Sequence, residues 1–98
     1  MAKVIFNHLV RKDLHEVLSF YEQEGSSALA DRFFEIFTQV ATRASENPRF
    51  FPPVTDHLRR ANLPDFPYHI LFREKPWGIR VLVLRHDRRH PNFGMRRS

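Results

Sequence analysis

The chain has 98 residues, of which 42% are hydrophobic and 28% charged, a composition typical of one folded domain rather than of a disordered or fibrous chain. The absence of cysteine excludes a disulfide scaffold, a thiolate nucleophile and a cysteine zinc site. No apolar run approaches the ~20 residues of a membrane span, and no signal peptide is recognisable at the start. We therefore expect one cytoplasmic domain over residues 1–98 that does not enter a membrane.

Positive charge is concentrated in the second half of the chain. The formal net charge is +5 and the pI is near 10.4. Residues 1–49 carry six basic and seven acidic side chains, whereas residues 50–98 carry ten basic and four acidic ones, nearly all of the basic ones arginine. Because guanidinium groups suit phosphate and carboxylate, we expect them to gather on one exposed side and meet a nucleic acid or an acidic protein surface. The alternative is that the arginine content only reflects a GC-rich genome.

The first half predicts a short strand followed by two helices. Residues 3–6 are β-prone, and Asn7 can cap a first helix, which Gly25 ends. Ser26-Ser27 can cap a second helix, which ends at Asn47-Pro48 because proline disfavours helical geometry in the residue before it. Both helices carry an apolar stripe at helical spacing. A short link between two such helices predicts an antiparallel hairpin.

The second half predicts three strands. They cover residues 57–62, 68–73 and 79–86, with a turn bracketed by Pro64 and Pro67 before the second strand. The third strand is apolar enough to lie at the centre of the sheet. The order is β-α-α-β-β-β, and we expect an α+β fold in which an N-terminal short strand and a helical hairpin pack on a small antiparallel sheet.

A basic tail, residues 87–98, follows the last strand. Since no periodic pattern ties it down, we expect this tail to be mobile and open to a partner.

Several short motifs follow one another in a familiar order. In chain order they are Asp13-Leu14, Phe20-Tyr21, Arg32-Phe33, Asn47-Pro48, Leu58-Arg59-Arg60, Phe66-Pro67-Tyr68-His69-Ile70, Val81-Leu82-Val83-Leu84-Arg85-His86 and Arg89-His90-Pro91. In order, spacing and total length, the chain resembles the RelE/ParE superfamily of toxins from type II toxin–antitoxin modules over nearly its whole length.

The resemblance implies a RelE/ParE-like fold and a bacterial toxin of the growth-inhibiting, plasmid-stabilising kind, neutralised by a cognate acidic antitoxin. It also implies two branches of action. We expect ParE-like action on a protein target such as DNA gyrase. The alternative is a RelE-like, ribosome-dependent mRNA endoribonuclease, and a weaker alternative is a non-toxic RNA-binding module.

Whether the chain is an enzyme stays open at this point. Cleavage of RNA without a metal needs a proton acceptor, cations for the phosphoryl oxygens and a proton donor. If the chain is a ribonuclease, the candidate catalytic residues are Arg59, His69, His86 and Arg89. Candidates for contact with a nucleic acid or another target are Arg60, Arg73, Arg88, Phe93, Arg96 and Arg97. We expect no cofactor and no metal ion.

The resemblance also shows where this chain departs from the ribonuclease members. By order along the chain, Arg59 and Arg60 match the basic residues of their second strand. His69 stands where a third-strand arginine is expected, and Asp87 falls near the arginine that follows the last strand. Phe93 lies near the terminal tyrosine, and it can stack on a base but has no hydroxyl. These departures favour the gyrase branch.

Each candidate also has a purely structural interpretation. Tyr68 fits a packing residue at the start of a strand, and His69 could be an ordinary surface histidine. His86 could simply hydrogen-bond to a neighbouring strand. Because Arg59 and Arg60 are adjacent on a strand, only one of them is expected on the ligand-facing side.

Overall fold

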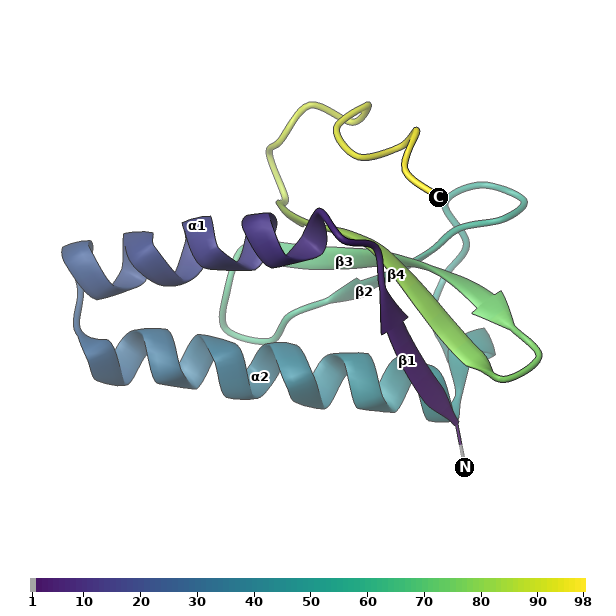
Figure 1. Cartoon of the computed structure of the whole chain (residues 1–98), viewed down its shortest axis with the longest axis horizontal. Coiled ribbons are helices and arrows are strands. Elements are labelled where there is room, and N and C mark those ends of the chain that lie inside the picture. The colour runs from purple at the N-terminus through teal and green to yellow at the C-terminus, as the bar shows by residue number, and fades with distance from the viewer. Residues whose placement is uncertain (1) are drawn as a thin grey trace.

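The computed structural model describes residues 2–98, in which a helical hairpin covers one face of a four-stranded sheet (Figure 1). The elements are β1 (Lys3–Phe6), α1 (Val10–Glu24), α2 (Ser27–Glu46), the 3-10 helix η1 (Pro48–Phe50), β2 (Arg59–Asn62), β3 (Tyr68–Lys75) and β4 (Gly78–His86). This order confirms the predicted α+β fold. Within residues 2–98, neither helix has the length and apolar character needed to cross a membrane.

The sheet has the strand order β1-β4-β3-β2, which confirms that the last strand is central. The antiparallel pairing predicted from the sequence holds for β2, β3 and β4, which short turns connect. β1 instead runs parallel to β4, so the sheet is mixed. The two strands are far apart in the chain, and no hairpin connection forces them into opposite directions.

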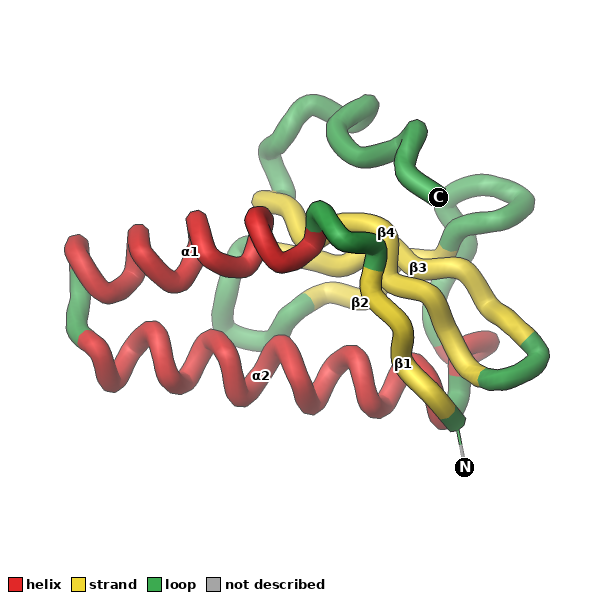
Figure 2. Tube along the Cα trace, in the orientation of Figure 1, coloured by secondary structure: helices red, strands yellow, loops and turns green. Residues whose placement is uncertain are grey.

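Local signals set the ends of the helices, which a short link joins (Figure 2). The Ser26 hydroxyl accepts a hydrogen bond from the Leu29 N–H at 3.1 Å, so the predicted cap of α2 is confirmed. The cap expected at Asn7 is displaced. Its side-chain oxygen accepts from the N–H of Leu9, the residue directly before α1 begins at Val10, at 2.9 Å. Asn7 therefore orders the approach to the helix rather than its first turn.

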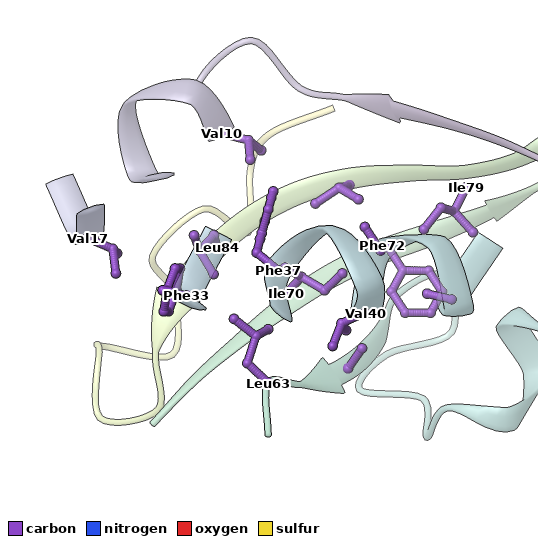
Figure 3. Close-up of a cluster of buried hydrophobic side chains, with 14 residues drawn as sticks. Val10, Val17, Phe33, Phe37, Val40, Leu63, Ile70, Phe72, Ile79 and Leu84 are labelled. Carbon is purple, nitrogen blue, oxygen red and sulfur yellow. The ribbon is translucent and has the colours of Figure 1, made fainter. Parts of the chain in front are cut away.

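The hydrophobic core lies between the hairpin and the sheet (Figure 3). Phe33 and Phe37 of α2 pack there with Ile70 and Phe72 of β3, all of them buried. Burying a side chain of this size stabilises the fold by roughly 1.5–3 kcal/mol relative to leaving it exposed. The second amphipathic helix is thus the main cover of the sheet.

The other face of the sheet, which we call the outer face, carries most of the predicted site. Strand alternation directs Ile70 and Phe72 of β3 to the helices and places His69, Leu71 and Arg73 on the outer face. Leu71 pairs with Val83 and Phe72 with Val81, so β4 contains one extra residue, Leu82, at this point. Because of this bulge, paired residues of β3 and β4 point to the same face on both sides of it. By their pairing, the outer face also includes Arg60, Asn62, Arg80, Val83 and Arg85.

The tail, residues 87–98, folds back over part of the outer face, on the side of the sheet away from α2 (Figure 1). Gly94 has φ +80, and a Cβ there would lie 2.6 Å from a methyl carbon of Val83. Only glycine combines this conformation with such a close approach. The tail is therefore packed on the sheet at Gly94, while its mobility stays a prediction.

A buried ion pair ties the end of the tail to α1. The guanidinium of Arg97 donates to both carboxylate oxygens of Asp13, at 2.5 and 3.1 Å, and their side chains are only 13% and 4% exposed. The same carboxylate accepts the backbone N–H of Leu84 at 3.1 Å. In addition, the side-chain amide of Asn7 donates to the carbonyl of Ser98 at 2.8 Å. These bonds join the two ends of the chain.

We predict that Asp13→Ala lowers the free energy of unfolding by about 3 kcal/mol, because it leaves the Arg97 charge without its partner and the Leu84 N–H without an acceptor. Denaturant unfolding measures this. Arg32→Ala is the matched control, since it breaks an ion pair with Asp65 that is more than half exposed and should cost less than about 1 kcal/mol. Equal losses in the two variants would contradict the role given to Asp13.

Candidate functional site

The predicted site residues divide between the outer face and the tail. Arg60 of β2 lies opposite Leu71, and Arg59 lies opposite the buried Phe72, so only Arg60 is on the outer face, as expected for adjacent strand residues. Arg60 donates to the Asn62 side chain at 2.8 Å and to Asp87 at 3.2 Å.

His69 is fully buried beneath the start of the tail. Its Nδ1 lies 2.8 Å from the Asp87 carboxylate, and its Nε2 lies 2.9 Å from Nε of Arg85. Arginine carries only donors, so Nε2 of His69 must accept, which leaves the proton on Nδ1 for the bond to Asp87. Both ring nitrogens are thus engaged inside the protein, and the interpretation of His69 as a surface histidine is wrong.

Burial lowers the pKa of His69 from its ordinary value of 6.5, and the positive charges of Arg60 and Arg85 act in the same direction. The hydrogen bond to Asp87 and its negative charge oppose this shift only in part. A second proton would have to enter at Nε2, where Arg85 already donates. His69 is therefore a neutral bridge between two charged side chains.

Arg85 is a site residue that our sequence reasoning did not select. Besides the bond to His69, one of its terminal nitrogens donates to the carbonyls of Pro91 and Phe93, at 2.7 and 2.9 Å. It therefore holds the first part of the tail against the sheet. The available signal was an arginine within an otherwise apolar central strand, since a buried charge of this kind needs partners.

A hollow of about 190 Å³ lies where the tail leaves the sheet beside α1. His86 and Arg89 line it together with Phe20 and Tyr68. The His86 ring packs edge-on against Tyr68, with centroids 5.0 Å apart, and its Nδ1 accepts the backbone N–H of Arg88 at 3.0 Å. The structure thus brings two of the candidate catalytic residues, His86 and Arg89, to one surface hollow, and their catalytic role stays a prediction.

Phe93 is covered by cations of the tail itself. The guanidinium carbon of Arg89 lies 3.9 Å from the centre of the Phe93 ring, and that of Arg97 lies 5.1 Å away. Such cation–π contacts stabilise the folded tail. A nucleic-acid base that stacked on Phe93 would have to displace at least one of them.

The remaining predicted residues are spread out. Arg59 donates to the carbonyl of Phe51 at 2.7 Å, while Arg97 is held by Asp13. Arg88 and Arg96 are exposed in the tail. The expected gathering of guanidinium groups is thus only partial. Arg60, Arg73 and Arg80 lie on the outer face, whereas Arg59 and Arg97 are held by bonds within the protein.

We predict that the free energy of unfolding falls as the pH drops below about 6.5, because the unfolded chain takes up a proton at His69 more readily than the folded protein does. The stabilisation is complete above that pH and is lost as the pH falls through the lower pKa of the folded state. His69→Gln should weaken this dependence, since the amide can donate to Asp87 and accept from Arg85 without titrating. Denaturant unfolding at about pH 7.5 and about pH 5.5 measures it.

The matched control is His57→Gln, which removes an exposed histidine of the loop before β2. That variant should keep the acid sensitivity of the original chain. If both variants lose stability in acid to the same extent as the original chain, His69 is not its source.

Comparison with known proteins shows the family and supports the fold. The family model "ParE toxin of type II toxin-antitoxin system, parDE" matches residues 4–91. The fold is similar to a solved structure, "Chromosomal ParDE TA system from P. aeruginosa", with a TM-score of 0.76 and 16% sequence identity, covering 88% of this chain and 96% of that chain. No curated protein matches the sequence. Because the family model spans nearly the whole chain, the protein belongs to the ParE family of type II toxin–antitoxin toxins, within the RelE/ParE superfamily.

Proposed function

We propose that this toxin acts in the cytoplasm on a protein target, DNA gyrase, rather than by cutting RNA. The observation that supports this is that the outer face exposes no histidine in the part of the chain that the structure describes. Its histidine, His69, has both nitrogens engaged by Asp87 and Arg85 and is 1% exposed. The side chains that do reach the surface there are mainly arginines.

Arginine alone is a poor catalyst of RNA cleavage. It can neutralise charge that builds up on phosphoryl oxygens, but it does not give up its proton and so cannot accept one from a 2′-hydroxyl. Recognition of a negatively charged protein surface asks for no proton transfer. The outer face is therefore better suited to binding than to this reaction.

Ribosome-dependent mRNA cleavage is the second candidate, and one observation favours it. His86 and Arg89 line the same hollow, so an imidazole that could accept or donate a proton lies close to a guanidinium group. The third candidate, a non-toxic RNA-binding module, gains no such support. Modules that bind single-stranded RNA on a sheet stack bases on exposed aromatic residues, whereas the outer-face positions defined above hold aliphatic, basic and amide side chains.

We infer that a cognate antitoxin covers an apolar groove beside the hairpin. The groove has a volume of about 420 Å³ and lies on the helical side of β1. Phe6 and Phe34, which line it, are 41% and 46% exposed, and His8 and Arg11 lie among its other lining residues. Exposed aromatic surface with cations nearby suits an amphipathic segment that carries acidic residues.

For the target, we predict that the purified toxin inhibits supercoiling by gyrase and increases the amount of cleaved plasmid DNA trapped with the enzyme. His86→Gln should leave this inhibition unchanged, because the ring serves no reaction in the proposed mode. Mapping transcript 5′ ends after induction tests the alternative. New ends confined to translated messages, lost in His86→Gln and Arg89→Ala and accompanied by unaffected gyrase, would overturn the proposal.

For the antitoxin, we predict that Phe34→Ser weakens binding by about 10–30-fold, the effect of losing an aromatic anchor from an interface. Calorimetric titration of the purified pair measures this. Because Phe34 is largely exposed, the variant should melt close to the original temperature. The matched control is Phe50→Ser in η1, where a phenylalanine that is 71% exposed lies outside the groove. Equal loss of affinity in both variants would argue against the groove.

A further inference from the structure

Two arginines stand directly opposite each other on the outer face. Arg73 of β3 and Arg80 of β4 are register partners, so their side chains leave the same side of adjacent strands, which lie ~4.8 Å apart. Both are partly exposed. Within residues 2–98, neither guanidinium makes an ion pair or a side-chain hydrogen bond.

This arrangement weakens the sheet, because like charges directly opposite each other on neighbouring strands repel. The nearest acid in sequence, Glu74, cannot relieve it: alternation turns Glu74 to the other face, where Arg49 lies 3.4 Å from its carboxylate. Asp87, near the far end of these strands, is engaged by His69 and Arg60. Asp56 lines a hollow together with Arg73 and Lys75 but makes no ion pair with either. Within residues 2–98 no ion pair thus offsets the repulsion, and an external anion would relieve it.

Further cations extend the pair across the sheet. Lys3 of β1 and Lys75 of β3 are both register partners of Gly78 and so flank a position that has no side chain. Arg60 of β2 lies at the opposite edge, where it is paired with Asp87. We call this set the basic stripe: Lys3, Arg60, Arg73, Lys75 and Arg80. All four strands contribute to it.

The surroundings of the basic stripe indicate which anion it fits. Of its neighbours on this face by register, Leu71 and Val83 are buried, whereas Ile5 is exposed and aliphatic. The exposed aromatic nearest to the stripe in sequence is Trp77, in the turn between β3 and β4. Single-stranded nucleic acids are bound through aromatic side chains that stack on bases. Trp77 could stack on one base at most, whereas the cations are spread over all four strands. That spread matches the regularly spaced phosphates of a duplex, which need no base contacts.

We propose that the basic stripe binds the phosphate backbone of double-stranded DNA, independently of sequence. This goes beyond action on gyrase, because the contact requires no other protein. It also differs from antitoxin binding, since the apolar groove lies on the helical side of β1 and the basic stripe lies on the outer side.

The test uses a fluorescently labelled DNA duplex of about 20 base pairs and the full-length toxin, with binding followed by anisotropy at several salt concentrations. The double variant Arg73→Gln/Arg80→Gln should bind at least about tenfold more weakly. The slope of log affinity against log salt should become shallower by about two, because two phosphate contacts are lost.

The matched control is Lys12→Gln/Arg43→Gln, which removes the same charge from exposed positions on α1 and α2. It should keep most of the affinity and nearly the full salt slope. Equal losses in the two double variants would mean that only net charge attracts DNA, and the proposal would be overturned. Tighter binding of a single strand than of the duplex would overturn it as well.

Arg73→Glu separates binding from folding, because a carboxylate opposite Arg80 replaces repulsion with attraction. This variant should melt at the original temperature or above and yet bind the duplex more weakly than the single variant Arg73→Gln. If stripe variants lose affinity for the antitoxin but not for the duplex, the surface binds protein and the proposal fails. These measurements contain no gyrase, so their outcome does not test the proposed action on gyrase. Likewise, a failure of the toxin to inhibit gyrase would not contradict DNA binding by the basic stripe.

Discussion

The ion pair between Asp13 and Arg97 is the constraint on which the arrangement of this protein depends. β1 ends at Phe6, so beyond Val81 the central strand has no neighbour on that side. Asp13 fills the gap by accepting the Leu84 N–H, and Arg97 donates to the Leu82 carbonyl at 3.1 Å. Side chains from α1 and the tail thus complete a strand edge that would otherwise be left without hydrogen bonds.

The bond between Asp13 and Arg97 also fixes the tail over the outer face and so determines which side chains stay exposed there. With its end held by Asp13, the tail lies over the sheet, where Arg85 reaches its carbonyls and Asp87 meets His69. The groups best suited to proton transfer on this face are therefore used to hold the tail. Fixed positive charge remains at the surface, and that favours binding over catalysis.

Two surfaces of opposite character meet at β1. Successive side chains of a strand point to opposite faces, so Phe6 enters the apolar groove beside the helices while Ile5 lies next to the basic stripe. An antitoxin held in the groove and an anion held on the stripe would occupy different sides of the same strand. A four-residue strand thereby separates the apolar groove from the basic stripe.

Much of the fold followed from the sequence, because helix periodicity, the Ser26 cap, the Asn47-Pro48 end and the apolar last strand act through near neighbours in the chain. Arg59 and Arg60 divided between the two faces for the same local reason. Only the tertiary structure could show that β1 is parallel, that His69 is enclosed by Asp87 and Arg85, or that Arg73 faces Arg80. These features depend on strand register and on contacts between distant segments, and the same residue pattern is compatible with other registers until the whole chain has packed.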